Sequence, residues 1–313
     1  MKIVFLDAKT IGEDIDLSGF DALGEVVKYG FSTAQEARER SKDADVLILN
    51  KVQVNEQTIG EADHLKLVCV TATGTNNLDK EYLNKRGIAW RNVAGYSTES
   101  VAQHTFAMLF YLLEKLPYYD NYVKSEKYVN DVSFTHFAKA FHELSGMTYG
   151  IIGLGNIGRR VADIAKVFGC RVIYYSTSGR NSQPGYERVS FDELLEQSDI
   201  VSIHAPLDEN TLGLMSKEAF AKMKKSAILL NVGRGPIINE ADLAEALNNK
   251  TIAAAGLDVL SVEPMQEDNP LRGIKDSERL LITPHIAWAG VEARNRLMGI
   301  ILGQIKEFFK AHE

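Results

Sequence analysis

The sequence predicts an α/β protein of two doubly wound domains, each with a parallel sheet covered by helices on both faces. Two observations predict this class. Short apolar runs alternate with helical patterns along the chain, in two separate series. A glycine-rich turn, GLGNIG, joins an apolar run to a helical pattern early in the second series. The chain has 313 residues, which is enough for two such domains.

The first series begins with a buried strand at residues 2–6. The N-terminus is too short in apolar length and too acidic for a signal peptide. Further strands are predicted at 45–50, 66–71 and 88–92, with a polar helix at 33–42. Residues 97–116 show a long helix pattern, with Ser97 or Thr98 as the N-cap and Pro117 at its end. This helix should carry the chain from the first domain into the second.

The second series begins with a strand at 149–152, the glycine turn, a helix that runs to Phe168, and a strand at 172–175. Four more strands are predicted at 200–205, 227–232, 251–258 and 280–283. An amphipathic helix at 291–312 should return to the first domain. The expected domains are therefore 1–98 with 290–313, which is discontinuous, and 99–289. A ligand is expected in the cleft between them.

The glycine turn has the spacing of a dinucleotide-binding fingerprint within a strand–helix–strand unit. Gly153 permits the tight turn, Gly155 lets the backbone approach a pyrophosphate, and Gly158 lets the helix pack closely on the strand. The following helix directs free N–H groups and its positive dipole end towards the phosphates. This context predicts a dinucleotide site.

The end of the next strand bears on which dinucleotide binds. NAD-selective sites place Asp or Glu there to hold the ribose hydroxyls, whereas this chain has Ser176. Without a carboxylate nothing repels a 2′-phosphate, and Arg180 could pair with it, which favours NADPH. The alternative is that Arg180 is a solvated loop residue and that the protein uses either NADP or NAD.

Composition excludes several classes of protein. The net charge is −7, which disfavours nucleic acid or an anionic membrane as a partner. No apolar stretch approaches the roughly 18 residues of a membrane-spanning helix. Cys69 and Cys170 lie in or beside apolar runs, which indicates buried, reduced thiols in a cytoplasmic protein. No Cys/His cluster has ligand spacing, so no metal site is expected.

Three residues that follow predicted strands could act on a keto acid. Arg234 could hold a carboxylate, His285 could protonate a carbonyl oxygen, and Glu263 could orient and support the charged histidine. Each also has a plainer interpretation, as a surface charge, a solvated loop carboxylate or a strand-end histidine. Spacing alone does not bring the three together.

Seven ordered motifs resemble one family. The chain resembles the D-2-hydroxyacid dehydrogenases, a family that includes D-glycerate dehydrogenase/hydroxypyruvate reductase and phosphoglycerate dehydrogenase. The similarity covers nearly the whole chain. The motifs are TATGTNNLD (71–79), NVAGYSTESVAQHT (92–105), ELSGMTYGIIGLGNIG (143–158), HAPLDENT (204–211), NVGRG (231–235), GLDVLSVEP (256–264) and TPHIAWAG (283–290).

The resemblance implies a Rossmann-type cofactor domain, a flavodoxin-like substrate domain and a homodimer. It implies that Arg234, Glu263 and His285 are catalytic. Substrate would also meet Lys51, the main chain of Ala72, Thr73 and Gly74, and Trp288. The cofactor would meet Thr73, Gly153, Gly155, Asn156, Ile157, Gly158, Ser176, Arg180, Ala205, Pro206, Val232 and Asp258.

The HIAWAG motif is more similar to the glycerate/hydroxypyruvate branch than to the lactate branch. Trp288 could close the pocket around a small polar substrate, although it could equally pack at a domain or subunit interface. The expected reaction is therefore hydroxypyruvate or glyoxylate to D-glycerate or glycolate. Gln103 replaces a Glu found in many members, and His104 and His204 are expected to be structural.

Other functions stay open at this point. A D-lactate-type or other 2-keto acid reductase is one alternative. Some relatives of this fold act as dinucleotide-sensing, corepressor-like proteins, which is an alternative of another class. The chain shows no regulatory domain after the fold, so feedback through such a domain, as in some phosphoglycerate dehydrogenases, is not expected.

Overall fold

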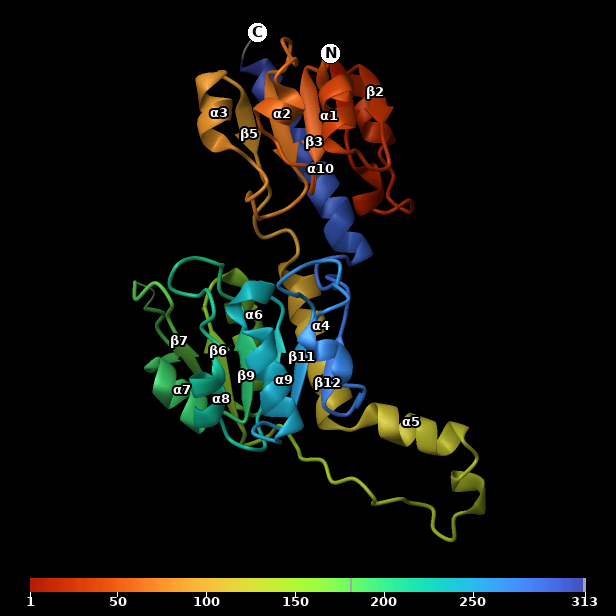
Figure 1. Ribbon diagram of the computed structural model, residues 1–313, viewed down its shortest axis with the longest axis vertical. Coiled ribbons are helices and arrows are strands. Elements are labelled where there is room, and N and C mark those ends of the chain that lie inside the picture. The colour runs from red at the N-terminus through yellow and green to blue at the C-terminus, as the bar shows by residue number, and fades with distance from the viewer. Residues whose placement is uncertain (181, 312–313) are drawn as a thin grey trace. The chain divides into compact units, whose positions relative to one another are not determined.

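The computed structural model describes residues 1–180 and 182–311. The chain divides into two compact units, Met1–Ser97 with Ala289–Glu313, and Thr98–Trp288. Relative to the predicted boundaries, Thr98 and Ala289 change sides. Each unit contains a sheet whose described strand pairs are all parallel, with helices packed on it (Figure 1). The predicted α/β fold class is confirmed.

The first unit has strand order β2-β1-β3-β4-β5, which is the flavodoxin-like order. The strands are β1 (Lys2–Phe5), β2 (Glu25–Lys28), β3 (Val46–Leu49), β4 (Leu67–Val70) and β5 (Ala89–Arg91). Short 3-10 turns at Ala8–Thr10 and Ser18–Leu23 connect β1 to β2. β2 was not predicted because its residues alternate poorly and stay partly exposed at the sheet edge.

Helices cover both faces of this first sheet. The helices α1 (Ala34–Ser41), α2 (Glu56–Ile59) and α3 (Lys80–Lys85) lie on one face, and α10 (Val291–Lys310) lies on the other (Figure 1). Capping boxes at Thr33 and Asn55 start α1 and α2. The last residue predicted for the C-terminal helix, His312, lies outside the described residues.

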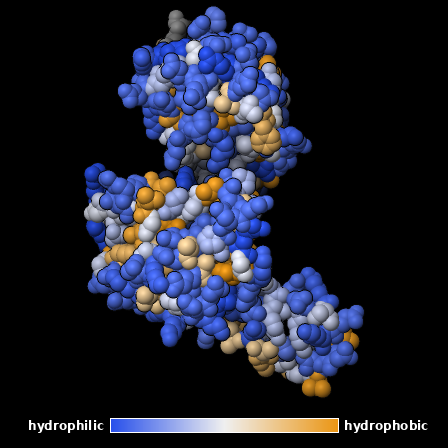
Figure 2. All heavy atoms as spheres, viewed as in Figure 1, coloured by the Kyte–Doolittle hydropathy of each residue, from blue (hydrophilic) through white to orange (hydrophobic). Residues whose placement is uncertain are grey.

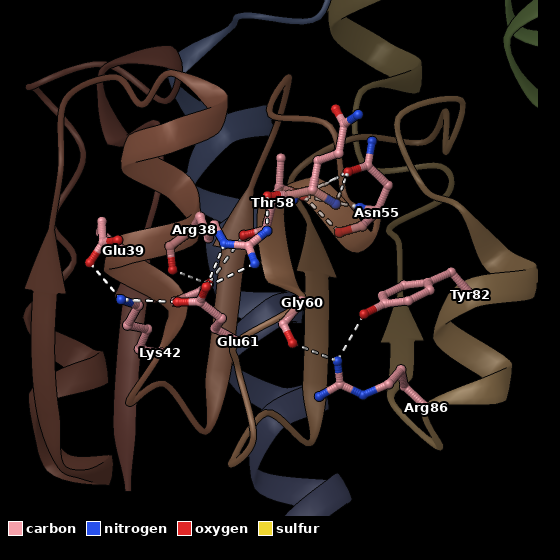
Figure 3. Close-up of polar contacts among 11 residues, drawn as sticks. Arg38, Glu39, Lys42, Asn55, Thr58, Gly60, Glu61, Tyr82 and Arg86 are labelled. Carbon is pink, nitrogen blue, oxygen red and sulfur yellow. Dashed lines mark hydrogen bonds and ion pairs between the residues drawn. The ribbon is translucent and has the colours of Figure 1, made fainter.

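Polar contacts tie the first unit's helices together at the surface. Arg38 of α1 pairs with Glu61, and Lys42 reaches both Glu39 and Glu61 (Figure 3). Arg86 donates to the Gly60 carbonyl oxygen and the Tyr82 hydroxyl (Figure 3). Exposed ion pairs of this kind contribute about 1 kcal/mol or less each, so the buried apolar faces dominate the packing.

The second unit has strand order β12-β11-β10-β9-β6-β7-β8, the Rossmann order with one more strand at the edge. The strands are β6 (Thr148–Ile152), β7 (Arg171–Tyr175), β8 (Glu187–Arg188), β9 (Ile200–Ile203), β10 (Ile228–Asn231), β11 (Ala254–Leu257) and β12 (Leu280–Ile282). β8 is short and exposed, and no apolar run predicted it.

Two hydrophobic clusters sandwich the second sheet. The helices α4 (Thr98–Leu113) and α6 (Asn156–Val167) contribute to one cluster. The helices α7 (Phe191–Gln197), α8 (Lys217–Lys222) and α9 (Glu240–Asn248) contribute to the other. Neighbouring strand residues face opposite clusters, as Ile151 and Ile152 do. Both faces of the sheet are therefore buried from solvent, as is usual for parallel sheets.

The prediction of one helix at 97–116 ending at Pro117 was wrong at its end. The helix α4 stops at Leu113, and Lys115 takes a left-handed conformation with φ of 56°. Pro117 lies in the first turn of a new helix, α5 (Leu116–Lys124). Proline lacks an N–H but fits the first helical turn, where that N–H has no partner anyway. Beyond α5 the chain has a short 3-10 turn at Tyr128–Asn130 and then an extended segment that leads to β6 (Figure 1).

Hydrophilic residues cover most of the face shown in Figure 2, with apolar residues in patches. Within the described residues, no helix is long and apolar enough to cross a membrane. Cys69 and Cys170 are both free and buried, as predicted. Burial raises the pKa of Cys69 to about 12 and that of Cys170 to about 11, so both thiols stay protonated near neutral pH.

Candidate active site

The glycine turn joins β6 to α6 with the backbone freedom that the sequence indicated. Gly153 has φ of 90°, and a Cβ there would lie 2.8 Å from the Ala205 backbone. A Cβ on Gly158 would clash with the Gly153 carbonyl oxygen, so the helix can sit this close to the strand only without a side chain. Around Gly155 a Cβ would meet no atom within 4 Å. The turn is thus tight on its inner side and open at Gly155.

This turn lies at the point where the strand order reverses, between β6 and β9. Open α/β sheets bind ligands at such switch points. Ala205 follows β9 and packs on Gly153, while Ser176 follows β7 and is buried, 4% exposed. Asn156 and Ile157 open α6, with their N–H groups in its first turn. Arg180 and Pro206 are exposed.

Arg234, Glu263 and His285 all follow the carboxyl ends of three adjacent strands. The registers pair Asn231 of β10 with Leu257 of β11, and Leu257 with Ile282 of β12. The loops that carry the three residues therefore leave the sheet side by side, at the carboxyl ends of its strands. His285 Nδ1 lies 2.7 Å from Glu263 Oε2. The structure thus brings His285 and Glu263 together as a hydrogen-bonded pair, which the sequence spacing alone could not show.

Backbone hydrogen bonds position both Glu263 and His285. Glu263 Oε1 accepts the Leu260 N–H at 3.0 Å, which fixes the carboxylate. His285 has φ of 56°, and its N–H donates to the Asp258 carbonyl oxygen at 2.8 Å. A non-glycine residue in the left-handed region is strained, and such strain persists only where surrounding contacts impose it. The imidazole is therefore presented in one orientation, with Nε2 free of the Glu263 contact.

The turn that carries Arg234 packs against the loop of Glu263. The Asn231 side chain donates to the Arg234 carbonyl oxygen at 3.0 Å and accepts the Gly233 N–H at 3.0 Å. Any side chain on Gly235 would clash with the Leu260 backbone. This close approach puts the arginine turn directly beside the segment whose N–H binds Glu263. Arg234 itself is partly buried, and its Nη1 donates to the Gly233 carbonyl oxygen at 2.7 Å.

Asp258 is buried and accepts hydrogen bonds from the loop that carries His285. The sequence did not show this role. It is 2% exposed, and its Oδ1 accepts the Thr283 hydroxyl at 2.6 Å and the Ile286 N–H at 2.9 Å. Its Oδ2 accepts the Ala287 N–H at 2.9 Å. Asp258 thus fastens the loop that carries His285 and Trp288. Trp288 is partly buried against the cluster that includes Ala287, and Val232 is buried after β10.

The first unit has its own cluster of loops at the switch point of its sheet. Asp7, after β1, is 3% exposed and accepts the N–H of Asn50, Lys51 and Val52, the contact with Lys51 being 2.7 Å. Burial raises the pKa of Asp7, and these three N–H groups oppose the rise. Lys51 follows β3, and Ala72, Thr73 and Gly74 follow β4. Thr73 Oγ1 donates to the Val93 carbonyl oxygen at 2.9 Å. Sequence reasoning missed Asp7, whose only signal was an acid directly after an apolar strand.

Comparison with known proteins assigns this arrangement to a family. Residues 106–287 match the model of the D-isomer specific 2-hydroxyacid dehydrogenase NAD binding domain. The chain is 38% identical to hydroxypyruvate reductase of Blautia hydrogenotrophica, over 99% of this chain and 97% of the relative. It is 32% identical to glycerate dehydrogenase of Methylorubrum extorquens, over 98% and 96%. D-lactate dehydrogenase from Aquifex aeolicus, solved with NAD and lactic acid, superposes with a TM-score of 0.85 at 26% identity, covering 99% of this chain and 96% of that one.

The chain belongs to the D-isomer specific 2-hydroxyacid dehydrogenase family. It is therefore an NAD(P)-dependent oxidoreductase of 2-hydroxy acids, with its NAD-binding domain in the second unit. The resemblance seen in the sequence is confirmed.

Two of the other histidines in this unit of the D-2-hydroxyacid dehydrogenase, His104 and His204, were expected to be structural. His104, on α4, has Nε2 3.0 Å from Thr283 Oγ1 and 3.5 Å from Asp258 Oδ1, so it braces the support of the His285 loop. His204 is partly buried, and desolvation lowers its pKa to about 3. A histidine that stays neutral at physiological pH is a poor proton donor, so His204 does not compete with His285.

Proposed function

We propose that this dehydrogenase reduces hydroxypyruvate or glyoxylate to D-glycerate or glycolate, with NADPH as the preferred cofactor. The observation that carries the chemistry is the 2.7 Å contact between His285 Nδ1 and Glu263 Oε2, at the sheet edge where Arg234 also emerges. The names of the two relatives, hydroxypyruvate reductase and glycerate dehydrogenase, support the substrate class.

We propose that the second unit holds the cofactor and the first unit the substrate. The open space at Gly155 and the start of α6 suit a pyrophosphate. A bound nicotinamide dinucleotide supplies the hydride. Ser176 carries no negative charge that would repel a 2′-phosphate, and Arg180 pairs with that phosphate. Around the rest of the cofactor we assign Thr73, Gly153, Asn156, Ile157, Gly158, Ala205, Pro206, Val232 and Asp258.

The chain's own residues then divide the work on the keto acid. Arg234 binds the substrate carboxylate, assisted by the main-chain N–H groups of Ala72–Gly74 and by Lys51. Nε2 of His285 donates the proton that the carbonyl oxygen takes up as it becomes an alkoxide. Glu263 accepts from Nδ1, which fixes the ring and offsets its charge. Trp288 limits the size of the substrate side chain.

The test is a set of initial rates for hydroxypyruvate, glyoxylate and pyruvate, each with NADH and with NADPH. Fast hydroxypyruvate or glyoxylate turnover that prefers NADPH is expected. A clear preference for pyruvate would replace the proposed substrate with the D-lactate type. The variant Ser176→Asp should shift preference towards NADH by repelling the 2′-phosphate, with Ser176→Asn as the neutral control for this buried position. NADPH use that is equal in both variants would contradict the selectivity argument.

We further propose that the enzyme is a cytoplasmic homodimer. The two buried free thiols suit a reducing compartment. Support for the dimer comes from the segment after α5, where Val129, Val132, Phe134 and Phe137 are 80–104% exposed. Large apolar side chains gathered in this way mark surfaces that another protein covers.

A further inference from the structure

A cavity of about 510 Å³ lies at the amino-terminal edge of the second unit's sheet. Its cationic lining comes from Lys115, Lys139, Lys225, Lys250 and Arg279. Lys225 precedes β10, and Arg279 directly precedes β12. Arg234, Glu263 and His285 follow the opposite ends of these strands and of β11. The cavity is therefore separate from the active site and from the glycine turn, at a distance of at least one strand, about 10 Å.

The cavity has an excess of positive charge. Five cations face two carboxylates, Asp276 and Glu278, in a chain whose net charge is −7. Only Lys139 forms an ion pair with either acid in the described part of the chain, with Nζ 3.2 Å from Glu278 Oε1. In the same described part, Lys115, Lys225 and Lys250 make no ion pair. Five cations outnumber the two carboxylates among them and repel one another, so a bound anion would relieve this arrangement.

Two of the lysines sit in strained backbone positions. Lys115 and Lys250 have φ of 56° and 57°, just beyond the ends of α4 and α9. Glycine or asparagine would take these positions at less cost. Attraction to the negative end of a helix explains a cation nearby, but not a lysine in the left-handed position itself. Among the described non-glycine residues, only Glu126 and His285 share this conformation.

The lining also indicates which anion fits. The Nη2 of Arg279 is taken by the carbonyl oxygens of Leu247 and Ile252, at 2.7 and 3.1 Å. The remaining charge is carried by ammonium groups, which act as point charges and commonly bind phosphate in that way. Partial burial lowers the pKa of Lys115, because its ammonium group is incompletely solvated. Several such groups around a small cavity suit a phosphate.

We propose that this cavity binds a small phosphorylated molecule with at least two negative charges. The volume is within the range of small-molecule sites. Such a site would not depend on an appended regulatory domain, because every lining residue belongs to the NAD-binding unit. It is also distinct from the cofactor site that the proposed function requires.

The experiment measures binding of inorganic pyrophosphate by calorimetry, at constant ionic strength, to enzyme already saturated with NADPH or NADH. The cofactor blocks the glycine turn, so any remaining site lies elsewhere.

Lys115→Asn and Lys250→Asn remove a charge and keep a residue that tolerates the left-handed conformation. Each should weaken binding about tenfold, since charged hydrogen bonds are lost. Glu278→Gln should tighten pyrophosphate binding, because it removes a negative charge that repels the anion. Lys127→Asn, an exposed lysine of the same unit, is the matched control and should change nothing.

Several results would overturn the proposal. One is the absence of pyrophosphate binding to the cofactor-saturated enzyme. Another is equal affinity in wild type, Lys115→Asn and Lys250→Asn, which would place the anion elsewhere. Citrate, run in parallel, tests the chemistry: if it binds the same lysines as tightly as pyrophosphate, the phosphate assignment fails. None of these measurements uses turnover, so they stand or fall independently of the proposed keto acid reduction.

Discussion

His285 is the residue on which the proposed chemistry depends most directly. Replacing it with alanine removes the proposed proton donor but leaves the glycine turn and Arg234 in place. We expect His285→Ala to lower kcat by about 100- to 10,000-fold, the usual contribution of a general acid, with little change in cofactor affinity. Steady-state kinetics and cofactor titration by fluorescence would measure this. His64→Ala, an exposed histidine of the other unit, is the control. Near-normal turnover by His285→Ala would remove it from the mechanism.

His204 should make the stability of the protein depend on pH. Its folded pKa is about 3, whereas the ordinary value is 6.5, so below pH 6.5 the unfolded chain binds a proton that the folded one does not. The free energy of unfolding should therefore fall as pH drops from 6.5 towards 3, by up to about 1.4 kcal/mol per pH unit from this group. His204→Gln should flatten that slope. Denaturant unfolding of both proteins at pH 7, 6 and 5 would measure the difference, and parallel slopes would contradict the assignment.

Residues whose role depends on backbone partners were hard to predict. Asp258 is in a motif, but nothing in the sequence shows that its oxygens accept the N–H groups of Ile286 and Ala287. Asp7 binds residues more than 40 positions away, and no periodicity reports such a contact. By contrast, the glycine turn was readable because local spacing alone determines a strand, a turn and a helix.

At the scale of elements, buried strands were predicted and edge strands were not. Apolar runs mark β3, β4, β9 and β10, which are buried on both faces. β2 and β8 lie at sheet edges and keep polar residues, so no apolar run marks them. Eight of the predicted strands extend past the observed ones at one or both ends, whereas β6 and β7 each begin one residue earlier than predicted. Pro117 was assigned to a helix end because proline both ends and starts helices.

The turn between β10 and the short 3-10 turn Gly235–Ile237 gives an element-scale prediction. Gly235→Ala puts a methyl group into the Leu260 backbone, which must move away. Since Leu260 N–H binds Glu263, the displacement should loosen the Glu263–His285 pair as well as the fold. We expect a loss of about 1–3 kcal/mol of stability, as for other overpacked sites, together with a fall in kcat.

A matched glycine separates this effect from the substitution itself. Gly299 lies within α10, and a Cβ there would meet no atom within 4 Å. Gly299→Ala should therefore stabilise the protein by up to about 1 kcal/mol, because alanine is the better helix former. Thermal unfolding of both variants beside wild type, with kcat measured on each, would show the opposite signs. Wild-type stability and activity in Gly235→Ala would contradict the close packing of the two loops.

For the whole molecule, the exposed segment after α5 determines the expected assembly. Phe134 and Phe137 are 90% and 86% exposed, so little of either side chain is covered by its own chain. A second copy of the chain would bury them, and because every copy carries the same segment, the contact can be repeated symmetrically. We therefore expect the wild-type enzyme to sediment as a dimer at micromolar concentration, and the double variant Phe134→Ser/Phe137→Ser to sediment as a monomer or to dissociate at much higher concentration.

The control for this experiment is Phe31→Ser, which removes an exposed phenylalanine of the other unit, 65% exposed, and should leave the dimer intact. Circular dichroism and thermal unfolding would establish that each variant is folded before its mass is compared. If dimerisation depends on the segment, dilution should shift the double variant to the monomer while the control stays dimeric. A dimer of unchanged affinity in the double variant would place the subunit contact elsewhere, and a wild-type monomer would contradict the proposed assembly altogether.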